Sequence, residues 1–214
     1  MARTGRPPIP PEEKAQRKIE EYMGKVIDLL MELGNVSEEE REFLDLTETP
    51  RRVAKMWVRE TLSYPDQPEV HLTEMDKEGD VVCLGPIGFA STCAHHLMPF
   101  TGHVWIAYLA DTKLLGLSKF TRIVKAHSKR LHLQEKLTRD VLDTLVEHLE
   151  PRAMLVVMRA GHGCVACRGV EDATQRTVTA AVHLPDSDIV NNGRLTEELY
   201  RVVGMAGGPS VASY

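Results

Sequence analysis

Two short clusters of cysteine and histidine, far apart in the chain, constrain its fold more than any other feature. The first reads Cys93-Ala94-His95-His96, and the second reads His162-Gly163-Cys164. Thiolate and imidazole groups are the ligands that zinc prefers in proteins. If a single ion binds both clusters, the fold must bring these two segments together.

The spacing within the clusters allows two kinds of zinc site. Cys93 and His96 are three apart, so one turn can aim both at an ion, while His162 and Cys164 would face the same side of a strand. Cys93, His96 and Cys164 alone would leave a position open for water, as in a catalytic site, whereas Cys167 as a fourth ligand would close a structural site. The spacing leaves both interpretations open, and it also allows a third, in which the chain binds no metal.

The stretch from Gly116 to Arg122 indicates a site for an anion. Ser118 follows an apolar strand end and is predicted to be the N-cap of a helix. Lys119 and Arg122 then lie on one face of the first turn, where the helix N-terminus also favours negative charge. The alternative is an ordinary solvated helix face.

Other stretches carry further candidate residues. Gln134-Glu135 begins a helix, where Glu135 either stabilises the helix dipole or accepts hydrogen bonds from N1–H and the amine of a guanine edge. Arg168 follows the second cluster closely enough to face whatever the metal holds, and Arg52 is a candidate anion contact. Cys83, among apolar strand residues, is predicted to be a buried core thiol.

The length and composition limit the class of protein. The chain has 214 residues, 43% of them hydrophobic, which suits one domain with an appendage or two small domains. No apolar run reaches the ~20 residues of a membrane helix, and the N-terminus lacks the apolar stretch of a secretory signal. Four cysteines point to metal binding in a reducing cytoplasm rather than to disulfides. A net charge of −5 argues against general nucleic-acid binding.

The periodicity of the apolar residues changes twice along the chain. Helices are expected over 11–33, after a capping box at Ser37 and Glu40, and from Thr49-Pro50 onward. The elements expected next are strands within 68–90 and over 101–110, helices over 118–150 with a break near 130–132, strands over 153–161 and 175–184, and a Gly-Pro-Ser tail. Strands that pair around a helical crossover predict an α+β fold with a mainly antiparallel sheet.

Taken together, these stretches resemble the GTP cyclohydrolase I family, from about residue 15 to residue 183 and in continuous motif order. No single motif is specific, but their combination is. The motifs are TPRRVAKM at Thr49–Met56, CAHHLMPFTG at Cys93–Gly102, GLSKFTRIV at Gly116–Val124, QEKLT at Gln134–Thr138 and HGCVACRG at His162–Gly169.

The resemblance implies a tunnelling fold, in which an antiparallel sheet is backed by two helices, with an N-terminal helical extension. We therefore expect a tail and helical extension over 1–66, a catalytic domain over 67–184 and a C-terminal segment over 185–214. The resemblance further implies a homodecamer whose active sites form where subunits meet, and the cysteine content indicates the cytoplasm as its location.

The resemblance also implies a role for each candidate residue. Zn²⁺ would be held by Cys93, His96 and Cys164, and the catalytic residues would be His95 and His162. The residues expected to bind GTP are Arg52, Ser118, Lys119, Arg122, Gln134, Glu135 and Arg168. Among these, the lysine and the arginines would hold the triphosphate, with Arg52 coming from a neighbouring subunit, and Glu135 would read the guanine base.

The implied reaction opens the imidazole ring of GTP at C8, releases formate and ends at 7,8-dihydroneopterin triphosphate. Zinc would make hydroxide available at neutral pH, His162 would protonate N7, and His95 would move a later proton. Two departures from the family pattern stand out. Ala94 replaces a glutamate, and residues 180–185 lack the usual Gly-x-Phe.

Two alternatives stay open on the sequence. A related enzyme of the same fold could open GTP but give a different pterin phosphate or supply a deazaguanine pathway. A non-catalytic zinc- or nucleotide-binding protein is the other alternative. The presence of both His95 and His162 argues against it, because a pure binder needs no such histidines beside a metal.

Overall fold

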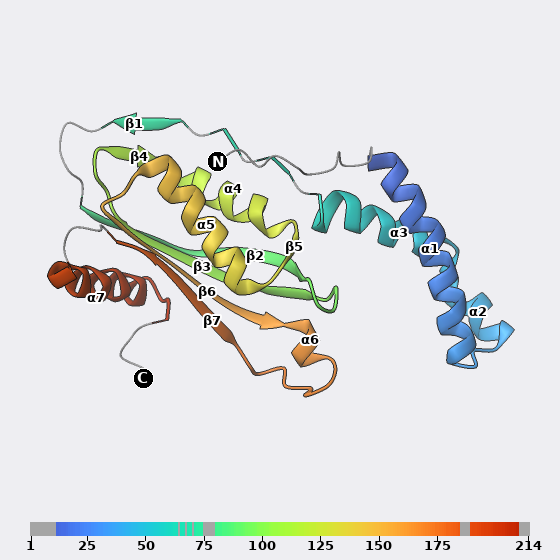
Figure 1. Cartoon of the computed structure of the whole chain (residues 1–214). Helices are drawn as coiled ribbons and strands as arrows, with labels where there is room; N and C mark the ends of the chain where they lie inside the picture. The colour runs from blue at the N-terminus through green and yellow to red at the C-terminus, as the bar shows by residue number, and fades with distance from the viewer. Residues whose placement is uncertain are drawn as a thin grey trace. The chain divides into compact units, whose positions relative to one another are not determined.

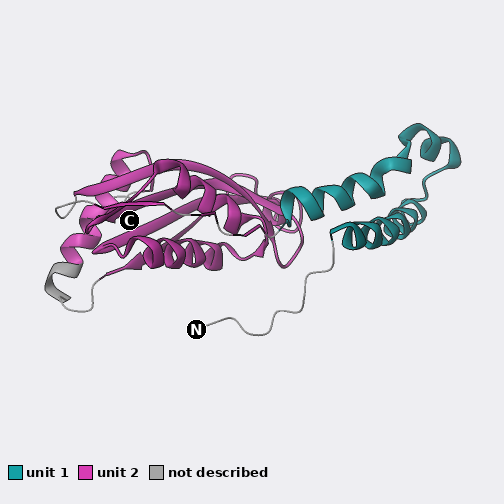
Figure 2. Cartoon of the chain, turned by 90° about the horizontal axis from the view of Figure 1, so that it is seen from above, with its two compact units in different colours: residues 1–63 teal, residues 64–214 magenta. Residues whose placement is uncertain are grey.

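The computed structural model describes residues 12–63, 65–66, 68–69, 71–74, 80–184 and 189–209. The chain divides into two compact units, unit 1 (residues 1–63) and unit 2 (residues 64–214), which are coloured separately in Figure 2. Among the described residues, no helix is both long enough and apolar enough to cross a lipid bilayer.

All the secondary-structure elements in the described part of unit 1 are helices. The predicted capping box is confirmed, because the Glu40 N–H donates to Ser37 Oγ at 3.2 Å and the Ser37 N–H donates to the Glu40 carboxylate at 3.0 Å. The elements of unit 1 are α1 (Glu12–Leu33), α2 (Glu38–Leu44), the 3-10 helix η1 (Leu46–Glu48), α3 (Thr49–Lys55) and the π-helix η2 (Met56–Thr61) (Figure 1). The long helix α1 contacts α3 but has no fully buried residue.

Unit 2 is built on a five-stranded sheet in the order β5-β2-β3-β6-β7. Its strands are β1 (Leu72–Glu74), β2 (Val81–Cys93), β3 (Pro99–Leu109), β4 (Lys113–Leu115), β5 (Leu131–His132), β6 (Ala153–His162) and β7 (Thr177–His183). Neighbours from β2 to β7 are antiparallel, the short β5 runs parallel to β2, and β1 and β4 form a separate antiparallel pair. The mixed α+β class with a mainly antiparallel sheet is therefore as predicted.

Helices cover both faces of this sheet. The helices of unit 2 are α4 (Leu117–Ser128), α5 (Gln134–Leu149), the short α6 (Gly163–Ala166) and α7 (Ile189–Met205). In Figure 1, α4 and α5 lie on one face of the sheet and α7 lies on the other. Side chains alternate between the faces along each strand, so Val104 and Ile106 pack in the core under α4 and α5, whereas Trp105 packs with α7.

Two details of the predicted order of elements are wrong. No helix was predicted after the last strand, but α7 follows it and buries Leu199 and Val203 against the sheet. Leu195, Leu199 and Val203 recur at the four-residue spacing that places them on one helix face, which is the signal that was missed. In addition, Ser118 is not an N-cap: α4 begins one residue earlier, and Gly116 precedes it.

Candidate metal and nucleotide site

The first cysteine-histidine cluster lies where β2 ends and the chain turns into β3. Cys93 is the last residue of β2, and its N–H donates to the Met98 carbonyl at 2.8 Å while the Leu97 N–H donates to the Cys93 carbonyl at 2.9 Å. Leu97 takes a left-handed backbone conformation, with φ of 54°. The turn therefore brings His96 back beside Cys93, as their spacing predicted.

The second cluster departs from its prediction. β6 ends at His162, and Cys164 lies in the short helix α6 rather than on a strand with that histidine. A Cβ on Gly163 would lie 2.9 Å from the backbone oxygen of Pro99, so the absence of a side chain lets α6 rest against the start of β3. This close approach carries Cys164 toward the first cluster.

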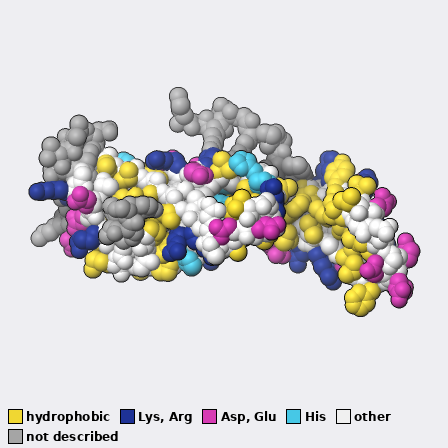
Figure 3. All heavy atoms as spheres, turned by 90° about the horizontal axis from the view of Figure 1, so that it is seen from below, with side chains coloured by type: hydrophobic (Ala, Val, Ile, Leu, Met, Phe, Trp, Pro, Cys, Tyr) yellow, Lys and Arg dark blue, Asp and Glu magenta, His cyan; other side chains and the backbone are white. Residues whose placement is uncertain are grey.

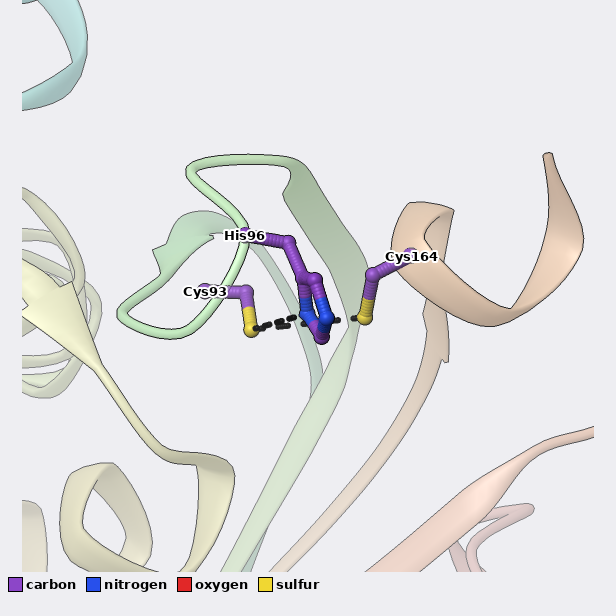
Figure 4. Close-up of side chains that lie close together, drawn as sticks. All are labelled: Cys93, His96 and Cys164. Atoms are coloured by element: carbon purple, nitrogen blue, oxygen red, sulfur yellow. Dashed lines mark hydrogen bonds between the residues drawn. The ribbon is translucent and has the colours of Figure 1, made fainter. Parts of the chain in front are cut away.

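Cys93, His96 and Cys164 bring their donor atoms within 4.8 Å of one another (Figure 4). The Cys93 Sγ is 4.0 Å from His96 Nδ1 and 4.0 Å from Cys164 Sγ. A tetrahedral zinc ion, with bonds of about 2.3 Å to sulfur and about 2.0 Å to nitrogen, sets its ligands roughly 3.6–3.8 Å apart. The observed spacing therefore fits a metal ion with little movement, and two sulfurs with one imidazole suit a borderline-soft ion such as zinc.

The other two cysteines lie outside this group. Cys167 follows α6 and is exposed, and no further histidine, cysteine or carboxylate in the described part of the chain joins the three donors. Cys83 is only half-buried and packs against the core under α7, where burial raises the pKa of its thiol. Burial, and then the neighbouring Cys93 thiol, also raise the pKa of Cys164. A bound cation would act in the opposite direction, because it stabilises the thiolate.

A buried glutamine holds the His162 ring. Gln134 is 2% exposed, and its Nε2 donates to the carbonyls of Met158 at 3.2 Å and Thr177 at 3.1 Å and to Thr179 Oγ1 at 3.0 Å. Carbonyls only accept, so these bonds fix the orientation of the amide and turn Oε1 toward His162 Nε2, at 2.8 Å. Since the amide oxygen also only accepts, Nε2 of the neutral His162 carries the hydrogen and Nδ1 keeps the lone pair.

The same ring lies flat on Phe100. The ring centroids of His162 and Phe100 are 4.8 Å apart and the planes differ by 2°. Burial lowers the pKa of His162, and the Glu135 carboxylate acts in the opposite direction. Neither the stacking role of Phe100 nor the buried position of Gln134 was predicted. In the sequence, a phenylalanine that stacks on a histidine cannot be told from any core phenylalanine, and a buried glutamine cannot be told from an exposed one.

Three other predicted residues lie close to the metal group. His95 is exposed, and its ring centroid is 6.2 Å from that of His96. Glu135 is exposed at the start of α5 and acts electrostatically on His162, while Arg168 is exposed after α6 and slightly lowers the pKa of Cys164 against the larger effect of burial.

The remaining predicted residues are on helices. Ser118 and Arg122 are exposed in the first turns of α4, and Lys119 between them donates from Nζ to the backbone carbonyl of Glu69. Arg52 is an exposed residue of α3 in unit 1. The structure thus brings Cys93, His96 and Cys164 together, with His162 next to them in the chain. The predicted cationic residues of α4 lie on the face of the sheet that α4 and α5 cover.

Comparisons with known proteins identify the same family as the motifs. The model of the family described as GTP cyclohydrolase I matches residues 23–202. GTP cyclohydrolase 1 of Wolinella succinogenes is 41% identical over 140 residues, which cover 64% of this chain and 75% of that protein. GTP cyclohydrolase 1 of Streptococcus pyogenes serotype M3 is 44% identical over 137 residues, which cover 63% and 71%. Among solved structures, the archaeosine synthase QueF-Like in the apo form matches 51% of this chain and all of its own at 18% identity, with a TM-score of 0.43.

Proposed function

Because this chain belongs to the GTP cyclohydrolase I family, we propose that it hydrolyses the imidazole ring of GTP and converts it to formate and 7,8-dihydroneopterin triphosphate. The observation that carries the proposal is the convergence of Cys93, His96 and Cys164 beside a histidine whose ring is fixed on two sides. A structural zinc site needs no such histidine, whereas hydrolysis needs a positioned proton carrier.

We assign the metal ligands as Cys93, His96 and Cys164 and the metal as zinc. Three protein ligands leave a coordination position open, which is the arrangement of a catalytic site. When bound, zinc supplies Lewis acidity, which makes hydroxide available at neutral pH. Cys167 and Cys83 take no part in this assignment.

His162 is the proposed proton donor to N7 of the base. Its Nε2–H is committed to Gln134, so the ring donates from Nδ1: it first takes up a proton there to become the imidazolium and then passes that proton to N7. Gln134 is in this proposal a positioning residue: it is buried, and it acts on GTP through His162. His95 is exposed beside the metal ligand His96 and carries a later proton.

The overall change balances with one net water. Water adds at C8 and the C8–N9 bond breaks to leave a formamide on N7. A second water cleaves that formamide and releases formate. The ribose then rearranges to a ketone, and the freed amine condenses with it to close the pyrazine ring, which returns one water.

GTP itself would be held by the charged residues around the group. Lys119, Arg122 and Arg168 contact the triphosphate, at the start of α4 and after α6, and Ser118 adds a hydroxyl. Guanidinium groups suit phosphate oxygens because their paired donors match two oxygens at once. Glu135 accepts two hydrogen bonds from the guanine edge.

We also propose the tunnelling fold and a cytoplasmic homodecamer, in which Arg52 reaches a neighbouring subunit's site. Two features support assembly. Within the described residues, β7 has β6 as its only partner strand and β5 covers just two residues of β2, so both edges of the sheet can pair further strands. Large apolar side chains of unit 1 are also exposed, namely Tyr22, Val26, Leu29, Leu30, Leu33, Phe43, Leu44 and Met56.

The decisive experiment incubates the purified, zinc-loaded protein with GTP and measures both formate and a pterin that becomes fluorescent on oxidation. Equal amounts of the two products are expected, with activity lost on chelation and restored by zinc. ATP should be rejected, because it presents an unprotonated N1 to Glu135. Arg122→Ala should keep its zinc but bind GTP more weakly, by a factor of roughly 10–100. Formate without a pterin would indicate a different end product, and neither product would refute the proposal.

A further inference from the structure

A hollow lies on the sheet face opposite α4 and α5. Along β3, Phe100 and Val104 point into the core under those helices, so the alternate residues Thr101, His103 and Trp105 belong to the other face. Trp105 packs with α7, and next to it the face is hollowed by a cavity of about 390 Å³. Figure 3 shows the molecule from the α7 side, with Lys, Arg and His side chains among the surface groups over unit 2.

The hollow is lined by three basic side chains and, among the described residues that line it, by no acidic one. These are His103 on β3, Arg159 on β6 and Arg176 just before β7. His103 and Arg159 are directly opposite each other in the β3–β6 ladder. Directly opposed side chains of two neighbouring strands lie close together on one face, so a single bound anion can contact both residues.

Arg176 is held in place by the backbone. Its Nη1 donates to the carbonyls of Ala173 and Gln175, both at 2.8 Å, which leaves Nε and Nη2 for another partner. Asp172 lies close enough for Arg176 to lower its pKa slightly, but its carboxylate already accepts from Thr174 and Gln175. The guanidinium is therefore held in position, and it forms no salt bridge with any residue that the structure describes.

The floor of the hollow has no side chains at two positions. A Cβ on Gly88 would meet no atom within 4 Å, and a Cβ on Gly161 would first meet the Arg176 Nη1, at 3.4 Å. The Arg176 guanidinium thus lies over Gly161, which is two residues from Arg159 on the same strand face. The bare floor and the converging cations form a recess that a compact anion can enter.

We propose that this hollow is a binding site for a small phosphate-bearing anion, separate from the proposed GTP site. Two guanidinium groups, an imidazole and the Thr101 hydroxyl present more donors than a carboxylate can accept in one plane, and a tetrahedral phosphate group matches them better. The sheet separates the two sites, because Gln134 and His162 lie on the α4 and α5 side with Phe100.

The proposal is tested by titrating inorganic phosphate and pyrophosphate into the zinc-loaded protein, using isothermal calorimetry. Arg122→Ala serves as the background, so that phosphate bound at the proposed GTP site contributes little. Adding Arg159→Ala with Arg176→Ala should weaken the remaining binding at least tenfold. Gly88→Val, whose side chain would enter the open hollow, should do the same with both arginines present. Arg139→Ala, an exposed arginine on α5, is the matched control and should change nothing.

Three outcomes would overturn the proposal: unchanged phosphate affinity in both hollow variants, equal weakening in the Arg139→Ala control, or acetate binding as tightly as phosphate. In the chain with Arg122 intact, Arg159→Ala with Arg176→Ala should still turn over GTP. The experiment therefore distinguishes failure of this site from failure of the proposed activity. Circular dichroism and zinc content of each variant show that the fold is kept.

Discussion

Cys164 and Cys167 are chemically identical and only three positions apart, yet only Cys164 has its sulfur near the other metal donors. Losing one of three ligands removes most of the affinity for a metal, whereas losing an exposed thiol removes none. We expect Cys164→Ser to lose its zinc and its activity, and Cys167→Ser to keep about one zinc per chain. Zinc per chain, measured by elemental analysis, decides this. Metal loss in Cys167→Ser would require a closed, structural site.

Gln134 gives a second prediction at this scale, because its amide links three backbone or hydroxyl acceptors to His162. Gln134→Ala should lower kcat for GTP by roughly 10–100-fold with little change in KM, since the histidine loses its fixed tautomer. It should also lower the free energy of unfolding by about 1–3 kcal/mol.

Thr179→Val is the matched control for this prediction. It removes a hydroxyl that contacts the same glutamine and Thr138 but leaves the bond from His162 to Gln134 in place. It should therefore destabilise the fold to a similar extent while keeping most of kcat. Equal losses of kcat in both variants would show that Gln134 has only a structural role.

At the scale of elements, the short helix α6 depends on its glycine. Since a Cβ on Gly163 would lie 2.9 Å from the Pro99 backbone oxygen, Gly163→Ala should push α6 away from β3 and move Cys164 with it. Zinc affinity should fall by about 10–100-fold, as for changes that misplace a metal ligand. Gly116→Ala, where an added Cβ meets no atom within 4 Å, should leave the affinity unchanged. A competition titration with a chromophoric chelator measures both.

The helix α7 gives the second prediction at the element scale. Leu199 is 1% exposed and packs against Leu155 and Val157, whereas Met205 on the same helix is 76% exposed. Leu199→Ala should lower the free energy of unfolding by about 2–5 kcal/mol, because it leaves a cavity, and Met205→Ala should change it by less than about 0.5 kcal/mol. Urea unfolding followed by circular dichroism tests both. Similar midpoints would mean that α7 is not part of the cooperative core.

At the scale of the whole molecule, acid should destabilise the fold through a buried histidine. His127 donates to or accepts from Thr144 Oγ1 at 2.9 Å, and burial, with a smaller contribution from Arg130, lowers its pKa from 6.5 to about 4. The unfolded chain binds a proton below pH 6.5 and the folded chain does not until about pH 4. The stability that the neutral His127 contributes is thus present above pH 6.5 and is lost as the pH falls toward 4, by roughly 3 kcal/mol.

The measurement is the free energy of unfolding of the chelator-treated protein at several pH values between 7.5 and 4. His127→Gln should give a shallower fall than the parent, because an amide does not titrate. Burial also lowers the pKa of His132, so some slope should persist in that variant. Parallel curves for the parent and His127→Gln would show that His127 does not govern the acid sensitivity.

The sequence by itself determined the parts that depend on local chemistry. The capping box at Ser37 and Glu40 was predictable because its two hydrogen bonds join residues three apart. The pairing of Cys93 with His96 was predictable because one turn spans them. The family motifs named the candidate residues, and the change from helical to alternating periodicity gave the mixed α+β class.

Only the tertiary structure decided which distant groups meet. Cys164 reaches Cys93 through a helix, not a strand, because Gly163 lets α6 approach β3, and that close packing is invisible in the spacing. Gln134 is turned inward by carbonyls from two other strands. The hollow exists only because the sheet register sets Arg159 opposite His103 and the chain before β7 carries Arg176 over Gly161. Such contacts join residues far apart in the chain, so no local pattern encodes them, and the packed sheet alone fixes their geometry.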